Sequence, residues 1–185
     1  MQRMNALVLV AVFLAAFVLT GLPSQAAEET VDIWKAAWTG NLEVVNQQLA
    51  AGTDVNAKAP SVGVTPLMAA AIAGQNDAAR LLLGKVAKTD IKNNEGSTAL
   101  HMAAFFGHIA IVKALLDKGA DVKIVNDRSE TPLDTVSADW SKELEGFYKV
   151  LGGMLKLELD LKKIKLSRPQ IAALLAKRGG TSGKV

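Results

Sequence analysis

Residues 98–122 read TALHMAAFFGHIAIVKALLDKGADV and contain both histidines of the 185-residue chain, His101 and His108. A threonine at a helix start can cap free backbone N–H groups, and a glycine at a helix end adopts the left-handed conformation without strain. We therefore expect two short helices here, separated at Gly107, the second with an apolar stripe facing inward. The class of the protein depends on whether the two imidazoles form a catalytic pair or hold a scaffold together.

The stretch is one copy of an internal repeat. Thr-Pro-Leu or Thr-Ala-Leu occurs at residues 65–67, 98–100 and 131–133, with a spacing of 33 residues each time. An earlier copy matches at a spacing of 34, and its extra residue falls within 57–64, where a loop absorbs an insertion at little cost. A fixed period of this length is typical of a solenoid, in which no unit can bury its apolar face alone.

Residues 98–122 resemble the ankyrin repeat nearly position for position, and the resemblance extends from residue 31 to about 137. It implies an all-α fold, an ankyrin-repeat α-solenoid of three full repeats and a fourth that is interrupted by a C-terminal insert. The expected repeat domain covers 27–140, with repeats at about 31–64, 65–97 and 98–130 and the start of the fourth at 131–140.

The resemblance also assigns roles to the two histidines. It implies that Thr98 and His101 tie successive turns and neighbouring repeats together by hydrogen bonds, and that His108 lies at the start of the second helix. Both imidazoles are then structural. An enzyme that uses His101 or His108 is the weaker alternative, since no third group is indicated near either ring to orient it.

Val86 departs from the repeat pattern. It occupies the position that Gly52 and Gly119 hold in other copies, and a β-branched residue with positive φ is a rare outlier. We therefore expect the helix before it to end differently, near Gly84, with φ at Val86 between about −60 and −120°.

The fourth repeat is interrupted after residues 131–140. We expect an insert over 141–167, a terminal capping helix over 168–180 and a flexible tail over 181–185. Pro169 fits the first turn of that terminal helix, with Ser167 as its cap.

The insert carries two overlapping patterns. Apolar residues follow helical spacing through Leu155, whereas the residues after it alternate at strand spacing, so their structure stays open. An apolar, basic insert also allows contact with a membrane surface through residues 147–168. Packing beneath the last repeat as a cap is the favoured reading, because terminal repeats need covering.

The first 26 residues are typical of a cleavable signal peptide: Arg3 precedes an apolar run over 6–19, and small residues lead to a cleavage site after Ala26. An uncleaved anchor is the alternative. Export to the periplasm or the medium is expected. The chain has no cysteine, which excludes disulfides, thiolate zinc sites and a cysteine nucleophile.

No sequence motif indicates chemistry. The C-terminal GGTSGKV fails as a phosphate loop, because Val185 stands where Ser or Thr would bind magnesium and no helix follows. No paired-histidine metal motif, nucleophile elbow or dinucleotide fingerprint occurs. We expect no enzyme activity, no cofactor, no metal and no nucleic-acid ligand.

The expected function is therefore binding of another protein, by a chain that is expected to be monomeric. The family implies a concave face built from the first helices and the loops between repeats. Either the apolar residues on this face only pack between repeats, or they form an anchor strip for a partner. The candidate strip and its polar rim of loop tips are Trp38, Ile72, Phe105, Phe106, Met102, Lys58, Lys92, Asn93, Asn94, Asp127 and Arg128.

Overall fold

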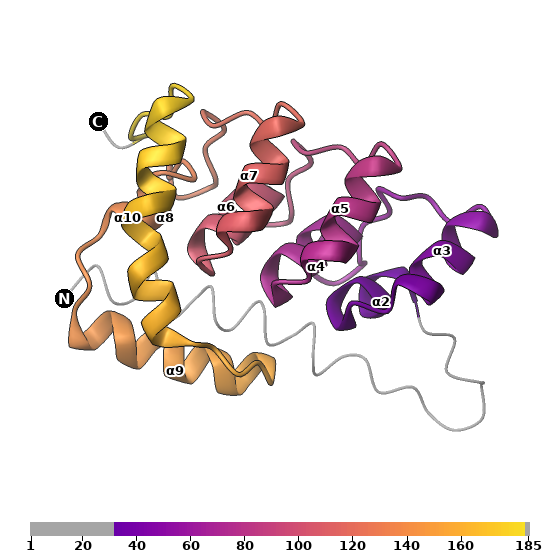
Figure 1. Ribbon diagram of the computed structural model, residues 1–185, viewed down its shortest axis with the longest axis horizontal. Coiled ribbons are helices and arrows are strands. Elements are labelled where there is room, and N and C mark those ends of the chain that lie inside the picture. Colours follow the sequence, from indigo (N-terminus) through magenta and orange to yellow (C-terminus); the bar gives the residue numbers. More distant parts are fainter. Residues whose placement is uncertain (1–31, 184–185) are drawn as a thin grey trace.

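The computed structural model describes residues 32–183. The predicted signal peptide and residues 184–185 lie outside this range. Residues 32–183 form helix pairs that stack side by side, without a β-strand among them (Figure 1). This arrangement confirms the predicted all-α solenoid. No helix within the described range is both long enough and apolar enough to cross a bilayer.

The stack has two layers. The inner layer contains the first helix of each repeat: α2 (Ile33–Thr39), α4 (Pro66–Ala73), α6 (Ala99–Phe105) and α8 (Asp134–Ser137). The outer layer contains α3 (Leu42–Ala50), α5 (Asn76–Gly84), α7 (Ile109–Asp117) and α10 (Leu161–Lys177). Within each layer every helix packs against the next, and α9 (Lys142–Leu155) runs across one end of the stack (Figure 1).

Local sequence sets where the inner helices begin and end. Thr65 caps α4 by accepting the Met68 N–H at 3.3 Å, because the first amides of a helix have no partner within it. Glycines in the left-handed conformation follow α2, α4 and α6, with φ of 73, 72 and 75° at Gly40, Gly74 and Gly107. The helix end predicted at Gly107 is confirmed.

The prediction for Val86 is wrong. Helix α5 ends at Gly84 as expected, but Val86 has φ of 56° and lies in the left-handed region that Gly52 and Gly119 occupy in other repeats. The reason is the hydrogen bond from the Ala87 N–H to the Leu82 carbonyl, 3.1 Å long, which closes the helix in the Schellman manner. The hydrogen bond that closes the helix overrides the conformational preference of a β-branched residue.

The predicted boundary of the terminal helix is also wrong. Helix α10 begins at Leu161, so Pro169 lies in its interior, and the Ser167 hydroxyl donates to the Ile164 carbonyl at 2.9 Å within the helix instead of capping it. Asp160 is the real cap and accepts the Lys163 N–H at 2.9 Å. A proline here leaves the Lys165 carbonyl without its usual donor, and water can serve it because Lys165 is exposed.

The insert forms a cap on the last repeat. The helix predicted through Leu155 is confirmed as α9, and the chain after it forms a loop that leads into α10 rather than a strand. Arg168 of α10 is buried and donates to the Thr135 and Ala138 carbonyls at 3.2 and 2.9 Å. Its positive charge therefore satisfies carbonyls at the C-terminal end of the four-residue helix α8.

Residues 181–183 are not the free tail that was expected. The Asp134 carboxylate accepts hydrogen bonds from the Ser182 hydroxyl at 2.6 Å and the Gly183 N–H at 2.8 Å, while Thr131 donates to the Thr181 carbonyl at 2.8 Å. Partial burial alone would raise the pKa of Asp134, but hydrogen bonds from Ser182, Gly183 and Thr131 hold it below its usual range. The end of the chain thus covers the open face of the fourth repeat.

Candidate functional site

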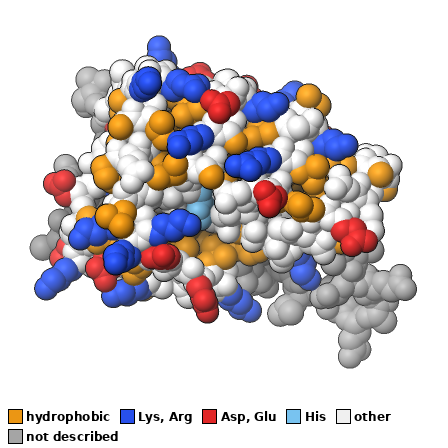
Figure 2. Space-filling view, viewed as in Figure 1, with side chains coloured by type: hydrophobic (Ala, Val, Ile, Leu, Met, Phe, Trp, Pro, Cys, Tyr) orange, Lys and Arg blue, Asp and Glu red, His pale blue; other side chains and the backbone are white. Residues whose placement is uncertain are grey.

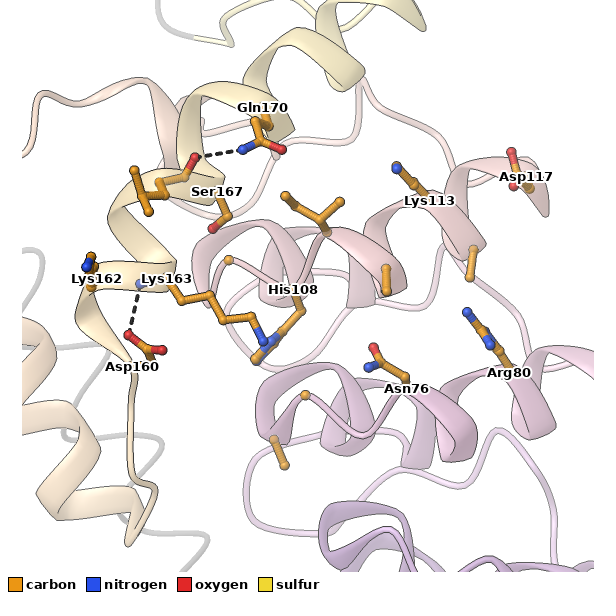
Figure 3. A pocket seen from close by; sticks show the side chains of 17 residues that line it. Asn76, Arg80, His108, Lys113, Asp117, Asp160, Lys162, Lys163, Ser167 and Gln170 are labelled. Carbon is orange, nitrogen blue, oxygen red and sulfur yellow. Dashed lines mark hydrogen bonds between the residues drawn. The ribbon is translucent and has the colours of Figure 1, made fainter.

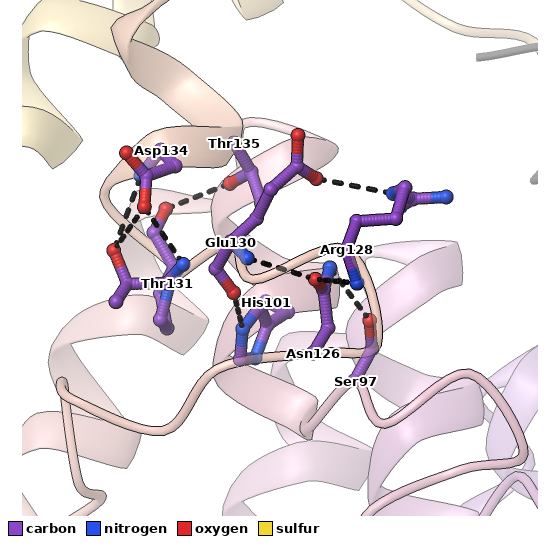
Figure 4. Close-up of polar contacts among 9 residues, drawn as sticks. Ser97, His101, Asn126, Arg128, Glu130, Thr131, Asp134 and Thr135 are labelled. Atoms are coloured by element: carbon purple, nitrogen blue, oxygen red, sulfur yellow. Dashed lines mark hydrogen bonds and ion pairs between the residues drawn. The ribbon is translucent and has the colours of Figure 1, made fainter. Parts of the chain in front are cut away.

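His101 is held by main-chain groups on both sides of its ring. Its Nδ1 lies 3.2 Å from the Thr98 N–H, as part of a capping box at the start of α6. Its Nε2 lies 3.0 Å from the Glu130 carbonyl in the next loop (Figure 4). A carbonyl oxygen can only accept, so Nε2 carries the proton and Nδ1 accepts from Thr98. The tie between neighbouring repeats that the resemblance implied is confirmed.

This environment fixes the charge of His101. The side chain is 2 % exposed, and burial lowers its pKa to about 4, with only partial compensation from the Glu130 carbonyl. The ring is therefore neutral at pH 7 and already uses both nitrogens. It cannot accept a proton from a substrate without breaking the Thr98 bond.

His108 occupies the predicted position before α7, yet its side chain does not cap that helix. The ring reaches back to the preceding repeat, where Nε2 donates to the Ile72 carbonyl at 3.2 Å. Burial lowers its pKa, and the nearby charge of Lys163 acts in the same direction. The two imidazoles thus serve different carbonyls and do not form a pair.

His108 belongs to a series of ties between repeats. The carbonyl two residues before each closing glycine accepts one hydrogen bond from the following unit: Trp38 from Gln75 at 3.1 Å, and Ile72 from His108. In the third repeat Phe105 accepts instead from the hydroxyl of Tyr148 in α9, at 2.7 Å. The insert therefore continues the repeat pattern with a different residue type.

Tyr148 is the centre of this cap. Its hydroxyl also accepts from Arg168 at 3.1 Å, and burial raises its pKa to about 12. Its ring stacks on Trp140, with centroids 5.6 Å apart, and packs against Phe105 at 5.0 Å. The apolar face of α9 is consequently used for packing inside the molecule.

The predicted apolar strip is not an exposed surface. Ile72, Met102 and Phe106 are 1, 5 and 1 % exposed, because each packs inside the stack. Trp38 and Phe105 are half-buried. Of the two readings of this strip, packing between repeats describes Ile72, Met102 and Phe106, and their predicted exposure is wrong.

The loop tips form a braced ridge, which we call the rim. Asn94 donates to the Ser61 carbonyl at 3.2 Å, the Asp127 N–H donates to the Glu95 carbonyl at 3.1 Å, and Lys92 reaches the Val125 carbonyl at 2.9 Å. Each loop is therefore fixed to the next. The outward side chains of Lys58, Lys92, Asn94 and Asp127 are exposed.

Two of the predicted rim residues are less available. Asn93 is buried and accepts from the Glu95 and Ser97 N–H groups, which holds its own turn. Arg128 is half-buried and pairs with Glu130 at 3.2 Å. We therefore define the rim as Lys58, Lys92, Asn94 and Asp127.

A groove of about 990 Å³ lies on the outer layer, between α5, α7 and α10 (Figure 3). His108 lines the groove (Figure 3), and a histidine side chain is visible in the hollow of the space-filling view (Figure 2). Four cationic side chains line it: Arg80, Lys113, Lys162 and Lys163. None of the four was predicted from the sequence, although Arg80 and Lys113 recur at the 33-residue spacing, a signal that indicates a shared face for this pair.

The ionisable side chains of the described residues do not gather into a metal site. No three His, Asp or Glu side chains within 32–183 are placed to share a metal ion. Both histidines are engaged with main-chain groups in neighbouring repeats, as described above. What the arrangement provides is two surfaces, the rim and the groove.

Comparison with protein families gives a direct match. Residues 33–126 match the family model described as ankyrin repeats (3 copies), which is half of the chain. Ankyrin repeats are protein–protein interaction modules.

Several curated proteins are similar over this region. Dauer abnormal formation protein 25 of Caenorhabditis elegans is 37 % identical over 92 residues, which cover 50 % of this chain and 24 % of that protein. The ankyrin repeat and KH domain-containing protein mask-1 of the same organism is 34 % identical over 102 residues, covering 55 % of this chain and 4 % of the relative. Ankyrin repeat and SAM domain-containing protein 6 of Rattus norvegicus is 35 % identical over 106 residues, which cover 57 % of this chain and 12 % of that protein. The chain thus spans a quarter or less of each of these relatives.

Proposed function

This chain belongs to the ankyrin repeat family, and we propose that it binds another protein through its rim without turning over a substrate. The observation that carries the proposal is the bracing of the rim, in which each loop tip is hydrogen-bonded to its neighbour. Loops that are already ordered lose little conformational entropy on binding, so more of the contact energy appears as affinity. The engagement of both imidazoles by the backbone supports a role without catalysis.

The rim differs from the strip that the sequence suggested. Phe105 packs against Tyr148, so its replacement by alanine would damage the cap as well as any binding surface. A test should instead use exposed side chains that make no hydrogen bond within the described residues. Lys58 and Asp127 meet this condition with their side chains.

The experiment is affinity capture from an extract of the native cells, with the Lys58→Glu/Asp127→Lys variant compared with the wild type. The matched control is Lys142→Glu/Glu158→Lys, which makes the same charge changes at exposed positions of the cap. We expect a stoichiometric partner that the control retains and the rim variant loses. Equal capture by all three proteins, or no partner at all, would contradict the proposal.

We further propose that residues 1–26 direct export and are removed after Ala26, so that binding takes place outside the cytoplasm. The support is the sequence of this segment, with Arg3 before the apolar run and small residues before the cleavage point. Intact-mass measurement of the protein from its native cells, together with fractionation, tests this directly. A chain that retains Met1 or Gln2 in a cytoplasmic fraction would contradict it.

A further inference from the structure

The groove on the outer layer has an unbalanced charge. Its two carboxylates are engaged: Asp117 pairs with Arg178 at 2.9 Å, and Asp160 caps α10. Its four cationic groups are exposed, and within residues 32–183 none of them makes an ion pair or a side-chain hydrogen bond. Unpaired cations that line a hollow concentrate the positive potential and attract an anionic ligand.

The same groove has an apolar component. Leu166 is 59 % exposed at its edge, and Ile109, Ala110 and Ala114 of α7 line its wall. A large aliphatic side chain exposed beside cations favours a ligand that carries both acidic and apolar groups. An inorganic anion would leave this apolar surface in water.

The placement of the four cations indicates an extended ligand. Arg80 and Lys113 stand on the outer helices of two repeats, and Lys162 and Lys163 stand on the first turn of α10, so they are distributed along the groove and do not converge on one point (Figure 3). A single phosphate would require convergence. A polypeptide segment with several carboxylates can meet them one after another.

Two other anionic partners fit less well. A membrane surface is broad, whereas these cations line a concave groove. Single-stranded nucleic acid is usually held by aromatic side chains on which its bases stack, and no Phe, Tyr or Trp lines this groove.

We propose that the groove between α5, α7 and α10 is a second binding surface, which takes an acidic segment of a protein partner. Carboxylates of the segment pair with Arg80 and Lys113 on one side and with Lys162 and Lys163 on the other. Its apolar residues cover Leu166 and the exposed part of α7. This surface is separate from the rim and does not depend on it.

The test uses a fluorescein-labelled peptide rich in Glu with interspersed Leu, titrated with the full chain by fluorescence anisotropy at low ionic strength. The control peptide carries Gln in place of every Glu. We expect binding of the acidic peptide only, and weaker binding as salt screens the charges. Equal binding of both peptides, or of neither, overturns the proposal.

Two charge-reversal variants locate the site. Arg80→Glu/Lys113→Glu and Lys162→Glu/Lys163→Glu change opposite walls, and each should raise the Kd about tenfold, because reversal replaces attraction by repulsion. Lys88→Glu/Lys142→Glu makes the same change in net charge at exposed positions outside both the groove and the rim, and should leave the Kd within about twofold of the wild type. If all three variants weaken binding equally, the effect is one of net charge and the proposal fails.

Two further arms distinguish other partners. Vesicles of phosphatidylcholine with phosphatidylglycerol, and a single-stranded DNA oligonucleotide, are titrated with the wild type and the groove variants. Binding of either that is tighter than peptide binding and is lost in the groove variants would assign the surface to that partner and overturn the proposal. The Tm of each variant is also measured, and a value equal to that of the wild type shows that the fold is retained.

Discussion

Val86→Gly should stabilise the protein, because it removes a strained conformation at an exposed position. Val86 has φ of 56°, while Gly52 and Gly119 take φ of 89 and 81° at the same repeat position. The left-handed conformation costs an L-residue about 1–2 kcal/mol, and more for a β-branched one. Against this, glycine lowers the free energy of unfolding by about 0.5–1 kcal/mol, because it makes the unfolded chain more mobile.

The side chain itself contributes little to this balance. Val86 is 83 % exposed, so its removal loses only a small part of the roughly 1.5–3 kcal/mol that full burial of such a side chain provides. The net expectation is a gain of about 1 kcal/mol in the free energy of unfolding, or a rise of about 2–4 °C in Tm for a chain of this size.

Urea unfolding followed by circular dichroism measures the change. Val86→Ala should fall between the wild type and the glycine variant, because it relieves the β-branch and keeps the Cβ. Val150→Gly is the control, since Val150 is exposed inside helix α9, where glycine should cost about 0.5–1 kcal/mol. A Val86→Gly protein that is less stable than the wild type would refute the argument from backbone strain.

Three further predictions concern the ties between units. The free energy of unfolding should fall by up to about 3 kcal/mol as the pH drops from about 6.5 to 4, because the unfolded chain protonates His101 more readily than the folded one. The pKa of His101 is about 4 in the fold and near 6.5 in the unfolded chain. The full stability is therefore present above pH 6.5 and is lost as the pH falls towards 4. Urea unfolding across this range checks it, and a His101→Gln variant with an equally steep decline would assign the effect elsewhere. Tyr148→Phe should lower the free energy of unfolding by about 1–3 kcal/mol, because it leaves the Phe105 carbonyl and one Arg168 donor unpaired. Val150→Ala, on the exposed face of α9, should be near neutral in the same unfolding assay. Asp134→Asn should speed amide exchange at Gly183, since the charged acceptor of that N–H is lost; unchanged exchange measured by NMR would show that the carboxylate does not hold the chain end.

Local signals in the sequence predicted much of the fold. The 33-residue spacing, the threonine cap and the closing glycine at 107 depend on interactions within one repeat, and the structure agrees with them. Their physical basis is the free amides and carbonyls at helix ends, which each repeat must satisfy for itself.

The failures have two causes. Residue preferences at Val86 and Pro169 are overridden by local hydrogen bonds, which close α5 at Val86 and start α10 at the Asp160 cap before Pro169. Residues 181–183 are bound by Asp134, about fifty residues before them, and so distant a partner cannot be recognised from a window of neighbouring residues.

The candidate site shows the same limit. Ile72 and Phe105 hold equivalent repeat positions, but Ile72 is buried in the stack, whereas Phe105 is half-buried against Tyr148 of α9. The groove combines Arg80 and Lys113, which the repeat places together, with a wall from α10 that the repeat does not predict.

The central claim is that the imidazoles are structural ties in a stack that works through its surfaces. Nitrogen-15 NMR of the two histidines, recorded as a function of pH, tests it most directly. We predict that His101 carries its proton on Nε2, takes up a second proton only near pH 4, and keeps this behaviour when a partner is bound. An imidazole at position 101 that titrates at or above 6.5, or that has its proton on Nδ1, would contradict the account.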